Sequence, residues 1–227
     1  MRNTWWAKTL RILGIVLMSL TAAFTLMGGA GTACVALNPT GWDGKFDALA
    51  PFQWLWILFV LVGIAAGILG VRAAVLLVRG RPNAYRVALT ALLLGTGLNL
   101  IHVFASRALR GASMPVDAVL YTNVLTLIVF LLFRLPPIWQ GVNYEKPAEE
   151  KETGKHAAAI ALALTGLLTL TIPYLMAPTH TIGGVNWADA WHVTLTTIGA
   201  ALLLSGVVTA LRARHAPARN LAAETTH

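Results

Sequence analysis

Charged residues occur in clusters along this chain, and the segments between the clusters are mostly apolar. Six of these segments approach or exceed the roughly 20 residues that a helix needs to cross a hydrocarbon core about 30 Å thick. We therefore predict an all-α integral membrane protein with short loops and a single transmembrane helical domain over residues 1–211. The six predicted transmembrane helices cover residues 12–37, 52–71, 87–106, 116–133, 157–176 and 190–211.

The fourth predicted span is the shortest of the six. Asp117 stands near its start, where a carboxylate belongs at the membrane interface rather than in the hydrocarbon. A short span is accommodated by a small tilt or by local thinning of the bilayer. We therefore expect residues 116–133 to cross the membrane with Asp117 at its outer edge.

The distribution of lysine and arginine predicts the orientation. With both termini in the cytoplasm, only three of the 17 basic residues lie outside, namely Lys45, Arg107 and Arg110. This arrangement follows the positive-inside rule, so we predict a multi-pass protein of the cell membrane with residues 212–227 as a flexible cytoplasmic tail. The formal net charge of +8 then reflects topology, and we expect no nucleic acid as a partner.

Composition excludes several classes of protein. With 57% hydrophobic and 11% charged residues, against about 25% charged in soluble domains, the chain is not a water-soluble globule. Its one cysteine, Cys34, cannot form a disulfide within the chain. None of the nine acidic residues lies inside a predicted span, which disfavours carriers driven by intramembrane carboxylates. The absence of a lysine within a span excludes a retinal Schiff base.

Three histidines are predicted to lie at similar depth near the outer face. His102 is near the outer end of the third span, where it shares a helix face with Asn99, while His180 precedes the sixth span and His192 opens it. One hypothesis is that His102 and His192 ligate a b-type haem through their imidazoles. Another is a transition-metal site completed by His180 or Asp189. The alternative is that each histidine is an interfacial residue with a packed ring.

Asn99 and Asn123 are the deeper polar side chains. Either they line a pocket for a quinone, lipid or small molecule, or each hydrogen-bonds another helix. Gly63 and Gly67 have the GxxxG spacing that lets two helix backbones approach closely. The partner of this glycine stripe is either another helix of the same chain or a helix of a partner subunit.

The sequence contains no motif that names a reaction: it lacks His-Glu-x-x-His, Gly-x-Ser-x-Gly and a phosphate-binding loop. We therefore assign no catalytic residue. The leading hypothesis is a multi-pass subunit of a larger membrane complex, with other membrane subunits as partners and a b-type haem or quinone near its outer face. One alternative is the small-molecule-binding component of a transporter. The other is an outer-face metalloenzyme that uses the three histidines and Asp189.

Overall fold

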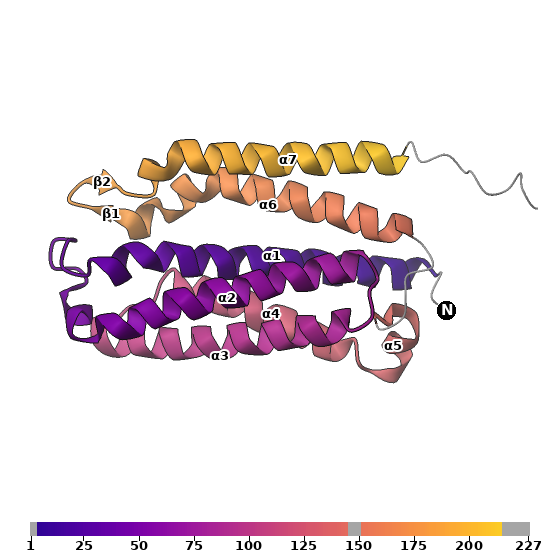
Figure 1. Ribbon diagram of the computed structural model, residues 1–227, viewed down its shortest axis with the longest axis horizontal. Coiled ribbons are helices and arrows are strands. Elements are labelled where there is room, and N and C mark those ends of the chain that lie inside the picture. Colours follow the sequence, from indigo (N-terminus) through magenta and orange to yellow (C-terminus); the bar gives the residue numbers. More distant parts are fainter. Residues whose placement is uncertain (1–3, 145–150, 215–227) are drawn as a thin grey trace, which may run out of the picture.

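The computed structural model describes residues 4–144 and 151–214, and helices dominate it (Figure 1). The long helices are α1 (Trp5–Leu37), α2 (Gln53–Val78), α3 (Ala84–Arg110), α4 (Val116–Leu132), α6 (Lys151–His180) and α7 (His192–Arg214). The short elements are the 3₁₀ helices η1 (Asp47–Phe52) and η2 (Asp189–Trp191), helix α5 (Pro136–Val142), and strands β1 (Thr181–Ile182) and β2 (Val185–Asn186). The two strands form a short antiparallel pair in the connection between α6 and α7.

The helices support the predicted membrane location. Among the described residues, five helices are long and apolar enough to cross a membrane, and a sixth span is added if α4 and α5, bent by 97°, count as one. The all-α membrane fold is therefore confirmed, while the count of six spans and the cytoplasmic termini stay predictions. Helix α4 has 17 residues and is about 26 Å long, slightly shorter than a typical hydrocarbon core. Below, the end of the molecule that carries His102 is called the outer end, following the predicted orientation.

Most of the helices extend beyond the apolar segments that predicted them. Helix α1 already begins at Trp5, and α3 continues to Arg110. Helix α6 continues through Pro173 and Pro178 and ends at His180. Hydropathy marks only the part of a helix that lies in hydrocarbon, whereas charged residues at a helix end keep the helical backbone and extend their side chains to water. Several helices are therefore longer than the membrane spans predicted within them.

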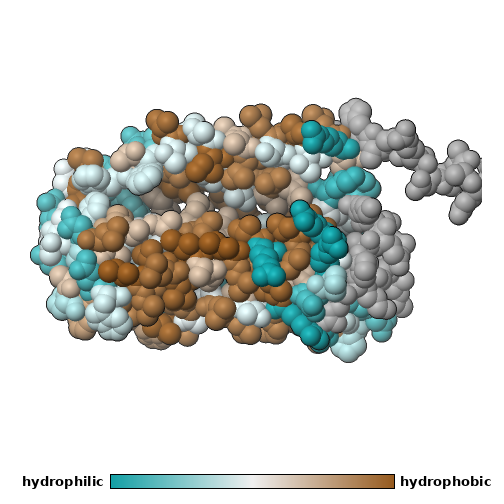
Figure 2. Space-filling view, viewed as in Figure 1, coloured by the Kyte–Doolittle hydropathy of each residue, from teal (hydrophilic) through white to brown (hydrophobic). Residues whose placement is uncertain are grey.

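Helices α1 to α4 form a four-helix body, and α6 and α7 form a hairpin beside it (Figure 1). Within the body, α1 packs against α2 and α4, and α3 packs against the same two helices from the opposite side. Helix α6 lies mainly along α1, while α7 lies along α6. In Figure 2 apolar side chains cover the middle of the molecule, and openings remain between the hairpin and the body. This apolar surface is suited to contact with lipid.

Glycines bring the helix backbones together within the chain. A Cβ atom added to Gly67 of α2 would lie 2.7 Å from the Cα atom of Leu26 on α1, and one added to Gly29 would lie 2.8 Å from the backbone nitrogen of Ile64. In the hairpin, a Cβ atom on Gly166 of α6 would lie 2.6 Å from a backbone nitrogen of α7. The glycine stripe of α2 therefore packs against a helix of the same chain, which confirms that interpretation of the GxxxG spacing.

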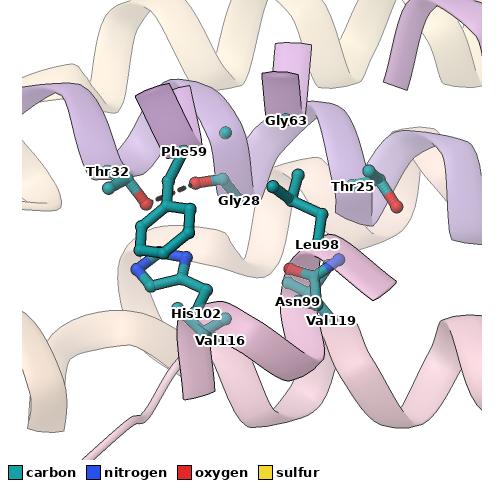
Figure 3. A pocket seen from close by; sticks show the side chains of 11 residues that line it. Thr25, Gly28, Thr32, Phe59, Gly63, Leu98, Asn99, His102, Val116 and Val119 are labelled. Atoms are coloured by element: carbon teal, nitrogen blue, oxygen red, sulfur yellow. Dashed lines mark hydrogen bonds between the residues drawn. The ribbon is translucent and has the colours of Figure 1, made fainter. Parts of the chain in front are cut away.

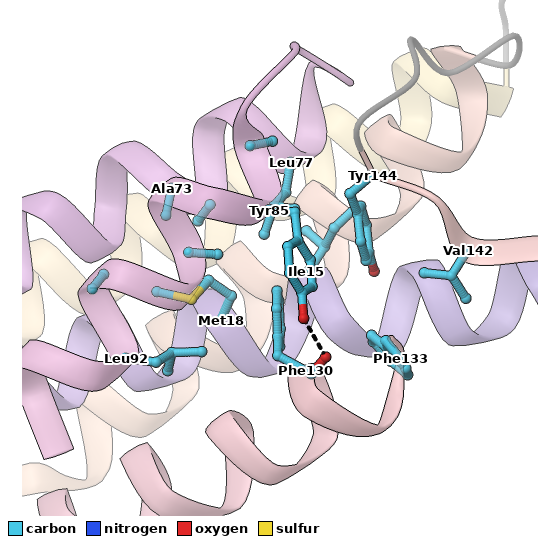
Figure 4. Packing of buried hydrophobic residues seen from close by; sticks show 14 of the residues in the cluster. Ile15, Met18, Ala73, Leu77, Tyr85, Leu92, Phe130, Phe133, Val142 and Tyr144 are labelled. Carbon is cyan, nitrogen blue, oxygen red and sulfur yellow. Dashed lines mark hydrogen bonds between the residues drawn. The ribbon is translucent and has the colours of Figure 1, made fainter. Parts of the chain in front are cut away.

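The inner half of the body holds the main apolar core (Figure 4). Ile15, Phe130 and Tyr144 are among its fully buried side chains. The Tyr85 hydroxyl donates a hydrogen bond of 2.7 Å to the Phe130 carbonyl, and the Tyr144 hydroxyl donates one of 2.9 Å to the Arg11 carbonyl. Because both hydroxyls have acceptors, these rings are buried without an unsatisfied polar atom. The main apolar core thus occupies the inner half of the body, and the cavity described below lies in the outer half.

Candidate functional site

One face of α3 supplies the polar residues of the outer half. Gly95, Asn99, His102 and Ser106 follow helical spacing, and all four are buried against the other helices of the body. Asn99 and His102 are each 6% exposed. The predicted shared face therefore points into the body, and it does not face the lipid.

A small cavity lies beside these two side chains, between α1, α2, α3 and α4 (Figure 3). Gly28 and Gly29 of α1 form one wall, and Phe59 of α2 covers His102. The cavity leaves about 10 Å³ for the centre of a water molecule, which is room for about one water. No lysine, arginine, aspartate or glutamate is among the described residues that line it.

His102 has an aromatic environment and, among the described residues, no hydrogen-bond partner. Its ring stacks on Phe59, with a centroid distance of 4.3 Å and an angle of 19°, and it meets the edge of Trp56 at 6.0 Å. Within residues 4–144 and 151–214, neither ring nitrogen makes a hydrogen bond, although the side chain is buried. The ring nitrogens are not fully enclosed, because the fully buried side-chain atoms without a partner among the described residues include Thr96 Oγ1 of the same helix but neither nitrogen of His102.

The two asparagines have different roles. The Asn99 amide donates a hydrogen bond of 2.7 Å to the Gly95 carbonyl, and its amide oxygen faces the side where His102 lies (Figure 3). Asn123 instead donates hydrogen bonds of 2.9 Å to the Thr25 hydroxyl of α1 and to the Val119 carbonyl. Asn123 therefore connects two helices, whereas Asn99 keeps a carbonyl oxygen for the cavity.

A second histidine cluster lies at the outer end of the hairpin. The His192 Nδ1 atom is 3.5 Å from the Asp189 carboxylate, and the two side chains are 50% and 65% exposed. His180 lies just beyond the apolar stretch of α6, and its Nδ1 atom is 3.2 Å from the Met176 carbonyl. Burial lowers the pKa of His180, the Met176 carbonyl partly offsets this effect, and the charge of Lys45 adds to it. This cluster lies at the surface, outside the four-helix body.

The structure does not bring His102 and His192 together. The hairpin packs on α1, whereas α3 lies on the opposite side of the body, so the two polar faces that the sequence placed at one depth do not meet. In the part of the chain that the structure describes, no three histidine, cysteine, aspartate or glutamate side chains are grouped as metal ligands. The set of His102, His180, His192 and Asp189 is therefore divided between two places.

An ion pair at the outer end fixes the start of α4. The Arg107 guanidinium donates hydrogen bonds to Asp117, at 2.7 Å, and to the Ser113 hydroxyl, at 2.9 Å. Ser113 in turn donates a hydrogen bond of 2.6 Å to the second Asp117 oxygen. Val116, next to Asp117, lines the cavity, so this trio positions one of its walls. Sequence reasoning placed Arg107 and Asp117 outside but missed their contact, since ten residues separate them across a loop.

A separate apolar cluster packs next to the cavity at the outer end of the body. Leu49 of η1, Trp56 of α2 and Ala36 of α1 are fully or almost fully buried against one another. The connection between α1 and α2 also meets the hairpin, because the rings of Trp42 and Trp187 make an edge contact at 5.1 Å. The sequence gives little indication of this cluster, because a short 3₁₀ helix does not produce a long periodic pattern of hydrophobic residues.

Comparison with known protein families, curated proteins and solved structures finds no match for this chain. The functional interpretation therefore rests on the geometry of the site. Among the described residues, the polar side chains that line the cavity are those of Thr25, Thr32, Asn99 and His102, and the rest of the lining is apolar or glycine. These polar groups can form hydrogen bonds with a bound molecule.

Proposed function

We propose that this chain is a membrane-embedded binding subunit that holds a small uncharged molecule in the outer half of its four-helix body. The observation that carries the proposal is His102, which is buried beside a cavity without a hydrogen-bond partner among the described residues. A fully buried polar group without a partner costs about 1–3 kcal/mol, which is an upper limit for His102 because its ring nitrogens are not fully enclosed. A ligand that satisfies the imidazole recovers that free energy, and this favours occupation of the cavity.

The surroundings of His102 favour an uncharged ligand. The described lining holds no side chain with a formal charge, and it lies among apolar helices. An ion without a counter-charge is very unfavourable in such a medium. The Phe59 ring and the valines of α4 instead provide an apolar wall. Together with the size of the cavity, they favour a neutral molecule with one small polar group.

The cofactors considered from the sequence fit this cavity less well. A haem macrocycle is far larger than one water molecule, and the second histidine proposed for it lies on α7. A quinone can place only one oxygen in a cavity of this size. Membership of a larger membrane complex remains part of the proposal, since the exposed face of α7 is apolar and accepts either lipid or a partner helix.

A transport component is the second candidate, and polar pairs below the cavity favour it. Thr25 accepts a hydrogen bond from Asn123, and the Thr21 hydroxyl lies 2.7 Å from the Thr126 hydroxyl one turn further inward. These pairs connect α1 to α4 and continue the line of polar groups from the cavity toward the apolar core around Met18. The test is the flux of urea and glycerol into proteoliposomes. We expect Met18→Ala to increase it if this core is a gate.

The direct test of binding compares molecules that remain bound during purification in native lipid nanodiscs. We expect wild-type protein to retain a small molecule that His102→Phe loses, because phenylalanine preserves the ring stack on Phe59 but has no ring nitrogen. His156→Phe is the matched control, since His156 is exposed near the inner end of α6. Extraction and mass spectrometry identify the difference. The same set of molecules in all three samples would contradict the proposal.

A further inference from the structure

We infer that the inner end of α2 binds an anionic phospholipid, with Arg72 as the residue that holds the lipid phosphate. This surface lies toward the opposite end of the body from the cavity, and the inference does not depend on the proposed function. Its basis is the position of Arg72 along α2, the side chains around it, and the distribution of charge at the inner end.

Arg72 lies at the depth of lipid headgroups. It follows Gln53, the first residue of α2, by 19 positions, which correspond to about 29 Å of helix at about 1.5 Å per residue. The hydrocarbon core of a bilayer is about 30 Å thick. With Gln53 at the outer boundary of the hydrocarbon, Arg72 therefore lies at the inner boundary, where the phosphates are.

The surface around Arg72 is apolar. Arg72 itself is exposed, and its neighbours one turn away on the same helix face, Ile68 and Val75, are 58% and 41% exposed. In Figure 2, hydrophilic side chains interrupt the apolar surface over the inner part of α2. The guanidinium group therefore emerges from a surface that lipid chains contact, and its own apolar stem can lie along that surface.

The described residues supply no counter-charge for Arg72. It makes no hydrogen bond or ion pair with any of them. Glu152 is the one acidic residue at the inner end that the structure describes, and its carboxylate is already 2.8 Å from the Lys155 ammonium. A positive charge without a partner at the edge of the hydrocarbon is unfavourable, so an anion that reaches this depth is favoured.

Further arginines extend the positive surface toward the cytoplasm of the predicted orientation. Arg79 follows Arg72 by seven residues and therefore lies on the same face of the helix. Arg81 lies in the connection to α3, and Arg86 lies in the first turn of that helix. All four arginines are exposed, and they raise the local concentration of anions at this end of the body.

A phospholipid matches both the charge and the apolar surface. Its phosphate oxygens accept paired hydrogen bonds from a guanidinium group, and its acyl chains contact Ile68 and Val75 at the depth just described. A soluble anion matches the charge alone. Phosphatidylglycerol keeps the negative charge of its phosphate, whereas the choline of phosphatidylcholine cancels it. We therefore expect phosphatidylglycerol to be bound in preference to phosphatidylcholine.

The test compares these two lipids with identical acyl chains. Full-length protein in detergent micelles is titrated with each lipid, and native mass spectrometry gives the dissociation constant of the first bound lipid. We expect phosphatidylglycerol to bind at least about fivefold more tightly, and Arg72→Gln to weaken its binding by about fivefold, which is the contribution of one basic residue at an anionic membrane surface. Binding of phosphatidylcholine should not change in this variant, and inorganic phosphate should not displace phosphatidylglycerol.

Arg212→Gln is the matched control. Arg212 is exposed near the inner end of α7 and has no partner among the described residues, so its removal takes the same charge from the same end of the molecule. We expect this variant to bind phosphatidylglycerol as the wild-type protein does. Arg79→Gln is a second variant of the site, and a smaller loss is expected because Arg79 lies beyond the depth of the phosphates.

Three results would overturn the inference. The first is equal affinity of the wild-type protein for the two lipids. The second is equal weakening in Arg72→Gln and Arg212→Gln, because binding would then follow net charge and not this surface. The third is displacement of the lipid by inorganic phosphate, which would make the ligand a free anion. If Arg72→Gln does not fold, the wild-type comparison and Arg79→Gln still decide. None of these measurements involves His102, so their failure leaves the proposed function intact.

Discussion

Removal of the Asp117 carboxylate tests how the outer end of the body is held. Asp117 is 7% exposed and accepts hydrogen bonds from Ser113 and Arg107, at 2.6 Å and 2.7 Å. In Asp117→Ala the buried Ser113 hydroxyl loses its acceptor, which costs about 1–3 kcal/mol. The favourable interaction of a carboxylate with the first turn of α4 adds about 0.3–1 kcal/mol. The Arg107 side chain is 56% exposed and is solvated by water when Asp117 is removed, so loss of the ion pair adds about 0–1 kcal/mol.

The total is a loss of about 3 kcal/mol in the free energy of unfolding. Reversible unfolding by SDS in mixed micelles measures it, and Asp117→Asn is the control because an amide oxygen still accepts from Ser113. We expect Asp117→Asn to cost about 1 kcal/mol, as it removes the charge and keeps one hydrogen bond. Double-mutant cycles should give a larger coupling for Ser113 with Asp117 than for Arg107 with Asp117. A cost below about 0.5 kcal/mol for Asp117→Ala, or the reverse order of couplings, refutes this reasoning.

Three further predictions address packing and topology. Gly67→Ala should destabilise the protein by about 1–3 kcal/mol in the same assay, because its Cβ atom would meet the backbone of α1, whereas Gly97→Ala, with open space around it, should be neutral or slightly stabilising. Phe130→Ala should cost about 3–5 kcal/mol, since the ring is fully buried in the inner core; a small loss would show that the core collapses around the gap. In a cysteine-free background, an impermeant maleimide should label Gly44→Cys from outside intact cells and should not label Ala148→Cys; the opposite pattern would reverse the predicted orientation.

The class of fold was predictable because crossing a membrane is a local requirement. A helix in hydrocarbon needs about 20 apolar residues, and that pattern is visible in any stretch of sequence without knowledge of its neighbours. Helix α4 was predicted almost to the residue, including Asp117 at its outer start. The face of α3 with Asn99 and His102 was likewise predictable, since helical spacing alone places these residues on one side.

The pairing of the helices was not predictable from the same pattern. His102 and His192 are equivalent in sequence terms, each near the outer end of an apolar span, yet one is 6% exposed inside the body and the other is half exposed at the end of the hairpin. The difference arises from backbone contacts between distant segments, such as Gly29 against the backbone of α2 and Gly166 against that of α7. The first contact holds α1 against α2 and the second joins the two helices of the hairpin, and hydropathy does not encode which helix each small residue meets. Local composition therefore determined that the helices are long and apolar enough to cross a membrane, while the close packing of particular glycines decided which polar side chains share a cavity.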